Sequence, residues 1–198
     1  PDDLLARRAR MPAAWTPEML EPGTTARDAV IGGIACLTCE TSAPGETILY
    51  LHGGGYRMGS PAAWANFASR LATATGCAIV VPDYRLAPEN RFPAALDDAV
   101  ACYRRLMIDG VPARKVVIAG DSAGGGLALA TLVTLRDRGD PIPAGAVLFS
   151  PWTDLAATGA TLETNNGRDP MFWGPAIGKA AHHYLGTMAA THPLASPL

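Results

Sequence analysis

The sequence has no long hydrophobic run, no strong excess of one charge and only four histidines among its 198 residues. A membrane-spanning helix needs about 18 or more consecutive apolar residues, so no membrane span is predicted. No secretory signal pattern opens the chain. The formal net charge is −2, and only Arg7, Arg8 and Arg10 cluster, which we interpret as a flexible, solvated terminus. These absences predict a protein that binds no nucleic acid and does not cross a membrane.

Cysteines are also few. Cys36 and Cys39 have a spacing used by metal and redox sites, but no second such pair follows. The strand predicted at 34–38 would also place these two side chains on opposite faces. We therefore expect Cys36, Cys39, Cys77 and Cys102 to be buried or incidental thiols in a reducing cytoplasm. No metal or cofactor is predicted.

The sequence does contain a glycine-rich turn after an apolar stretch. Residues 116–119 predict a buried parallel strand, and Gly120–Gly124 follow as Gly-Asp-Ser-Ala-Gly, the pattern of a nucleophile elbow. Such a turn strains the backbone at its serine, Ser122, and glycines on either side leave room for close approach. A helix is predicted to follow, placing free N–H groups beside the serine. The plainer alternative is a glycine-rich turn before an ordinary helix.

The order of predicted elements indicates an α/β protein. Strand, helix and strand follow one another between residues 115 and 149, which requires a parallel sheet. A turn at 42–45 predicts an antiparallel hairpin at one side of the sheet. The predicted strands are 30–41, 46–51, 77–81, 116–119 and 144–149, and the predicted helices are 62–75, 94–109, 122 to about 138 and about 175–185.

A second glycine-rich loop follows the strand predicted at 46–51. The His-Gly-Gly-Gly loop at 52–55 is a source of oxyanion-hole N–H groups in lipases and esterases, with the N–H after the nucleophile. The predicted donors are Gly53, Gly54 and Ala123. A phosphate-binding loop is the alternative, but its characteristic glycine and lysine spacing is missing. His52 precedes the serine and ends a strand, so we expect it to anchor the loop and not to act as the base.

Four blocks in sequence carry a family resemblance: 52–56, 83–89, 120–124 and 150–154. With them the chain resembles the bacterial hormone-sensitive-lipase-like esterases of the α/β-hydrolase superfamily. The resemblance implies a mostly parallel sheet with helices on both faces and a small helical cap. It implies Ser122 as nucleophile with the three donors above. We expect a single domain over 1–198, with core 29–154 and cap elements at 1–28 and about 155–195.

The chain departs from this family at its end. Family members continue with two more strands that carry the triad acid and histidine, and neither strand is present in these 198 residues. We do not expect His182, His183 or His192, the histidines after Ser122, to act as the base. We interpret the chain as the larger part of a longer enzyme. The strand at 144–149 would then be a bare sheet edge, open after Phe149 to self-association or a partner chain.

The predicted activity is cleavage of short-chain carboxylic esters through an acyl-enzyme on Ser122. The substrate would be a small-molecule ester bound beside Tyr56, Trp152, Met171 and Phe172. Ordinary cap packing is the alternative for the last three. Two other hypotheses remain open for the whole chain: a catalytically impaired fragment, or a ligand-binding module of the same fold.

Overall fold

A central sheet organises the computed structural model, which describes residues 4–170 and 173–198. Within these residues the sheet has six strands in the order β1-β2-β4-β3-β5-β6. The β3, β4, β5 and β6 strands run parallel, whereas β1 and β2 are antiparallel to their neighbours. Their bounds are β1 Thr25–Ile31, β2 Ile34–Glu40, β3 Thr47–Leu51, β4 Ala78–Pro82, β5 Val116–Asp121 and β6 Gly145–Phe149.

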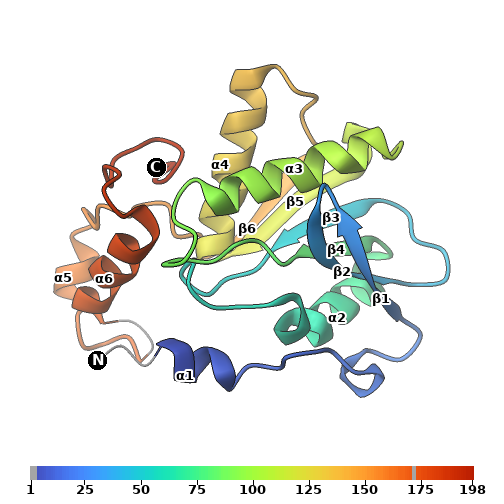
Figure 1. Ribbon diagram of the computed structural model, residues 1–198, viewed down its shortest axis with the longest axis horizontal. Coiled ribbons are helices and arrows are strands. Elements are labelled where there is room, and N and C mark those ends of the chain that lie inside the picture. The colour runs from blue at the N-terminus through green and yellow to red at the C-terminus, as the bar shows by residue number, and fades with distance from the viewer. Residues whose placement is uncertain (1–3, 171–172) are drawn as a thin grey trace.

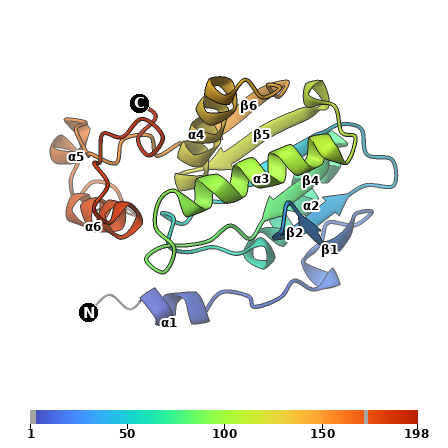
Figure 2. The same ribbon diagram turned by 45° about the horizontal axis from the view of Figure 1, so that its top comes forward.

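Helices cover both faces of the sheet, as predicted (Figures 1 and 2). The α3 (Ala94–Ile108) and α4 (Ala123–Arg138) helices share one apolar cluster with the sheet, and α2 (Ala65–Thr75) packs into a second cluster on the opposite face. Gly76 follows α2 and caps it in the left-handed conformation, which glycine adopts readily. Single-turn 3-10 helices occur at Pro17–Met19, Pro61–Trp64 and Ala113–Lys115.

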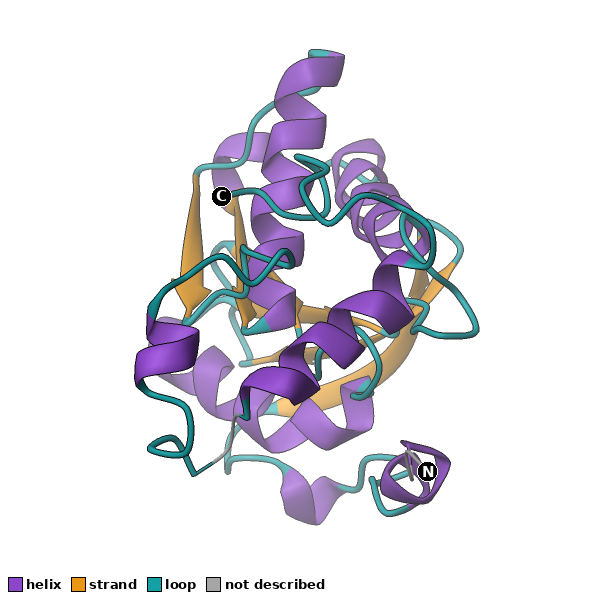
Figure 3. Ribbon diagram, turned by 90° about the vertical axis from the view of Figure 1, so that its left-hand side faces the viewer, coloured by secondary structure: helices purple, strands orange, loops and turns teal. Residues whose placement is uncertain are grey.

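The remaining helices lie at one end of the molecule. The α5 (Thr161–Thr164) and α6 (Gly174–Leu185) helices lie beside the edge where the parallel strands end, with α1 (Leu4–Ala9) below them in Figure 1. Seen from that side in Figure 3, α6 lies in front of the sheet. The buried face of α6 carries Ala181, Tyr184 and Leu185, which belong to the α3/α4 core cluster. This end of the molecule is therefore packed continuously with the core.

The predicted hairpin is wrong. The turn at 42–45 does not join paired strands, because β4 lies between β2 and β3. The hairpin instead joins β1 to β2 through Gly32 and Gly33, whose φ angles are +64° and +83°. Two successive residues with positive φ form the tight turn that suits the strand twist, and glycine adopts them without a Cβ penalty. Since β1 begins at Thr25, the predicted boundary at 28/29 falls inside a strand.

The predicted open edge of the sheet at β6 is confirmed within the described residues. The β6 strand pairs only with β5 among the described residues, so its outer edge is open. Val147 and Phe149 are each 46% exposed. Such exposure is high for a strand of parallel sheet, whose residues are ordinarily covered on both faces.

The predicted separation of the two close cysteines is also confirmed. Cys36 belongs to the core cluster under α3, and Cys39 to the one under α2, so they lie on opposite faces of β2. All four cysteines are free thiols.

Candidate active site

A strained serine connects β5 to α4. Ser122 has φ +52° and ψ −120°, outside the regions that residues with a side chain ordinarily adopt. Its N–H donates to the carbonyl of Phe149 at 2.9 Å, and its own carbonyl accepts from Trp152 N at 2.7 Å. The end of β6 and the segment after it therefore hold the elbow in this conformation.

The glycines around Ser122 are required by close backbone approach. A Cβ on Gly120 would collide with the backbone of Gly124 and Leu51, and one on Gly124 would collide with the carbonyls of Leu51 and His52. A Cβ on Gly126 would meet the carbonyl of Trp152 and the hydroxyl of Tyr56. The turn can therefore pack against the end of β3 only if these three residues have no side chain.

The loop after β3 passes across the elbow. Gly53 N donates to Asp121 Oδ1 at 2.8 Å on one side of Ser122, and the Tyr56 hydroxyl reaches Gly126 on the other. Gly54 and Gly55, which lie between these two contacts, have φ angles of +123° and +63°. Their N–H groups have no hydrogen-bond acceptor within residues 4–170 and 173–198.

The predicted donor Gly53 is therefore corrected. Its N–H is committed to the Asp121 carboxylate and cannot also serve an oxyanion. The sequence could not show this, because the commitment depends on a side chain 68 residues away. The Gly54 N–H has no acceptor in the described part of the chain. Ala123 opens α4, where the first N–H groups of a helix have no partner inside it.

His52 lies behind the loop, as an anchor and not as a base. Its ring is fully buried and stacks on Tyr84 with centroids 4.3 Å apart. Since a carbonyl oxygen only accepts, the 2.8 Å contact between Nδ1 and the Gly53 carbonyl places the proton on Nδ1. Burial lowers the pKa of His52 to about 4, so the ring is neutral at pH 7.

The other histidines come after Ser122, and neither His182 nor His192 makes a hydrogen bond to it in the described residues. His182 and His183 lie on α6, where His183 Nδ1 is 3.2 Å from the Arg57 guanidinium. His192 packs against Phe92 and accepts from Leu194 N at 3.2 Å. Within 4–170 and 173–198 the structure thus places a strained serine beside backbone N–H groups that have no acceptor, with neither His182 nor His192 bonded to it.

The predicted pocket residues have different positions. Tyr56 is only 1% exposed and stacks on Tyr184 of α6, so it packs the core and offers no surface to a substrate. Trp152 is half-buried beside Tyr56, with centroids 6.1 Å apart, and stays a prediction as a pocket wall. Met171 and Phe172 lie outside the described residues.

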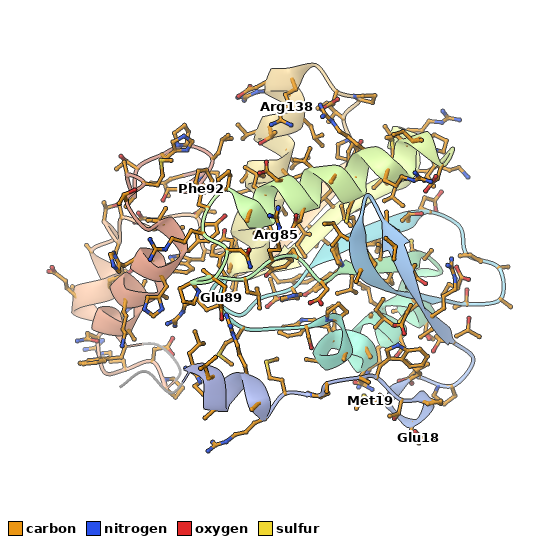
Figure 4. All side chains as sticks on the ribbon, in the orientation of Figure 1. Glu18, Met19, Arg85, Glu89, Phe92 and Arg138 are labelled. Carbon is orange, nitrogen blue, oxygen red and sulfur yellow. The ribbon has the colours of Figure 1, made fainter. Side chains whose placement is uncertain are left out.

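The interpretation of Arg8 as solvated is wrong. Its guanidinium donates to the carbonyls of Arg57 and Ala87 at 2.6 and 2.5 Å and pairs with Glu89 at 2.6 Å. Figure 4 shows Glu89 facing α1. Arg8 therefore ties the N-terminal helix to the loop after Tyr56, a role that a run of arginines in sequence does not reveal.

Two findings concern membrane spanning and metal binding. No helix of the described residues has the length and apolar character needed to span a membrane. In the same residues no group of three or more His, Cys, Asp or Glu side chains is arranged to hold a metal ion.

Comparison with known proteins places the chain. Residues 48–198 match the family model described as the alpha/beta hydrolase fold. An acetyl-hydrolase of Streptomyces hygroscopicus is 48% identical over 153 residues, which cover 77% of this chain and 51% of that protein. The chain thus spans about half the length of the curated relatives it matches.

Solved structures agree with this assignment. An esterase from the bacterial hormone-sensitive lipase (HSL) family superposes with a TM-score of 0.87 at 36% identity, over 98% of this chain and 70% of that one. The esterase EstE5 superposes with a TM-score of 0.89 at 40% identity, over 98% of this chain and 65% of that one. The fold, the elbow and these likenesses agree, and the chain belongs to the α/β-hydrolase family, with HSL-family esterases among its structural relatives.

Proposed function

We propose that Ser122 is the nucleophile of a carboxylic ester hydrolase. The observation that carries the proposal is the strained conformation of Ser122 beside a loop whose Gly54 and Gly55 N–H groups have no acceptor among the described residues. A strained residue persists only where its surroundings hold it, and such strain is concentrated at functional sites. The names of the relatives, acetyl-hydrolase and esterase, support the same reaction class.

The proposed reaction is acyl transfer in two stages. Ser122 Oγ attacks the ester carbonyl carbon and gives up its proton, while the carbonyl electrons move to the oxygen. The N–H groups of Gly54, Gly55 and Ala123 donate to that oxyanion. The intermediate then collapses, the alcohol leaves with a proton, and the acyl group stays on Ser122 until water hydrolyses it. The serine proton needs an acceptor, which no described residue supplies.

The proposed substrates are esters of short acyl chains. One relative is named an acetyl-hydrolase, and crystals of EstE5 were soaked with p-nitrophenyl butyrate. Trp152, half-buried beside the elbow, would bound the acyl pocket.

We place the protein in the cytoplasm, because its four cysteines are free thiols and disulfides are rare in that compartment.

A ligand-binding module is the second candidate. Such a module would bind an ester without acylating Ser122.

Hydrolysis of p-nitrophenyl acetate, butyrate and octanoate distinguishes the two candidates. The assay compares the chain with Ser122→Ala and with Ser42→Ala, which alters an exposed serine of a remote turn. Imidazole is added to supply a base, and the rate of Ser122→Ala in the same buffer is subtracted. An esterase gives imidazole-stimulated turnover in the chain and in Ser42→Ala, faster for acetate and butyrate than for octanoate. If the uncorrected rates of the chain and of Ser42→Ala equal that of Ser122→Ala, the binding module is favoured.

A further inference from the structure

We propose that Asp121 is a positioning residue that fixes the proposed oxyanion loop, residues 52–55, over Ser122. The inference deepens the proposed function and rests on it. Asp121 is the residue before the nucleophile, and the sequence pattern gives it no role of its own.

One carboxylate oxygen joins three parts of the fold. Asp121 Oδ1 accepts from Gly53 N at 2.8 Å and from the Tyr50 hydroxyl at 2.9 Å. Asp121 ends β5, whereas Tyr50 lies near the end of the adjacent β3 and Gly53 opens the loop that follows β3. The loop therefore starts from a point bonded to the residue next to Ser122.

The contact fixes Gly53 sterically as well as by hydrogen bonding. A Cβ on Gly53 would overlap Oδ2 of Asp121. Any other residue at this position would push the carboxylate away or lift the loop. Gly54 is restricted in turn, because its φ is +123° and a Cβ there would strike the backbone of Met58. With its first residue bonded and its second confined, the loop has little freedom in where the Gly54 and Gly55 N–H groups point.

Tyr50 holds the carboxylate from beneath. Its side chain is 1% exposed and packs on Phe67 of α2, with ring centroids 4.9 Å apart. Burial, together with the Asp121 charge, raises the pKa of the Tyr50 hydroxyl, which therefore remains a donor across the working pH range. The hydroxyl has a fixed direction, and through it the sheet core sets the position of Oδ1.

Asp121 acts through the loop and not on the substrate. Its carboxylate makes no hydrogen bond to Ser122 in the described residues. An oxyanion hole stabilises the transition state more than the bound ester, so a misplaced loop lowers kcat and leaves KM nearly unchanged. Loss of folded protein would also lower the apparent kcat without changing KM, so rates are expressed per mole of folded protein and amide exchange at Gly53 separates the two roles.

The variants separate these roles. Asp121→Ala removes the acceptor of the Gly53 N–H, whereas Asp121→Asn retains an oxygen there. Asp28→Ala is the matched control, because Asp28 also accepts a side-chain hydrogen bond, from Trp15, but on β1. Tyr50→Phe removes only the hydroxyl that donates to Asp121 Oδ1 and leaves the Gly53 N–H bond in place.

Two measurements test the proposal on the 198-residue chain. Amide hydrogen exchange at Gly53 reports the bond directly, and we expect Asp121→Ala to accelerate it by about 10- to 100-fold. Asp121→Asn and Asp28→Ala should stay within about threefold of the wild type by the same reasoning. Ser122 acylation by p-nitrophenyl acetate in imidazole buffer should slow by about 10- to 100-fold in Asp121→Ala, with Asp121→Asn largely restored.

The outcomes are distinct for the two proposals. Unchanged Gly53 exchange in folded Asp121→Ala overturns the positioning role. Faster exchange with wild-type acylation also overturns it and leaves the esterase proposal standing. A wild-type chain that never acylates Ser122 overturns the esterase proposal, and with it the catalytic meaning of the Asp121 contact.

Discussion

Tyr56 and Tyr184 stack face to face, with ring centroids 3.7 Å apart and planes 4° from parallel. Tyr56 follows the three glycines of the loop after β3, and Tyr184 lies on α6. Both rings are fully buried. The stack therefore couples the helix at the end of the molecule to the loop that lies over Ser122.

Removing this stack should destabilise the protein. We expect Tyr184→Ala to lower the free energy of unfolding by about 3–5 kcal/mol, because it empties a buried aromatic site and removes a ring contact. Tyr184→Phe keeps the ring and should cost less than about 1 kcal/mol. Urea unfolding at pH 7 measures both values. Equal stability of the two variants would show that the ring packing contributes little.

The glycine hairpin offers a pair of matched substitutions. Gly32 and Gly33 both have positive φ, but a Cβ on Gly32 would strike the backbone of Ala101, whereas one on Gly33 meets open space. Gly33→Ala should therefore cost only the backbone strain of about 1–2 kcal/mol. Gly32→Ala should cost about 1–3 kcal/mol more because α3 must shift. Thermal or urea unfolding of both variants tests the order, and a costlier Gly33→Ala would contradict this geometry.

His52 should make stability depend on pH. Burial lowers its pKa to about 4 in the folded protein from an ordinary value of 6.5. Between these values the unfolded chain binds a proton that the folded chain does not, so stability falls as pH drops from 6.5 toward 4. The loss attributable to His52 is on the order of 3 kcal/mol at most and is complete below pH 4.

The matched variants for this test are His52→Asn and His182→Asn. Asparagine at 52 can still donate to the Gly53 carbonyl but does not titrate, so it should flatten the change in unfolding free energy between pH 7 and pH 4.5. His182 lies on the exposed side of α6, and its variant should keep the wild-type slope because His52 is intact. An unchanged slope in His52→Asn would contradict the assignment.

The sequence predicts the parts of this fold that depend on local signals. The strand and glycines around Ser122, the helix ending at Gly76 and the strand at 144–149 follow from periodicity and turn residues close in the chain. Strand neighbours are a non-local property. The turn at 42–45 predicts a hairpin, yet β4 inserts between the flanking strands, and the Gly32-Gly33 signal was missed.

The site divides in the same way. The nucleophile and the Gly54 and Ala123 donors could be proposed from motifs. The bond from Gly53 to Asp121, the burial of Tyr56 under Tyr184 and the tie from Arg8 to the loop could not, since each joins segments far apart in sequence. In each case a side chain of ordinary type acquires its role from a tertiary contact.

The central claim is that Ser122 is an activatable nucleophile, and mapping a covalent adduct tests it most directly. The chain, Ser122→Ala and Ser42→Ala are treated with a fluorophosphonate in imidazole buffer, digested with trypsin and sequenced by mass spectrometry. Ser122 is the only serine between Lys115 and Arg136, so a single tryptic peptide reports it. We predict one adduct, on that peptide at Ser122, in the chain and in Ser42→Ala, and none in Ser122→Ala. An unlabelled Ser122 in the folded chain, or labelling that persists in Ser122→Ala, would contradict the account.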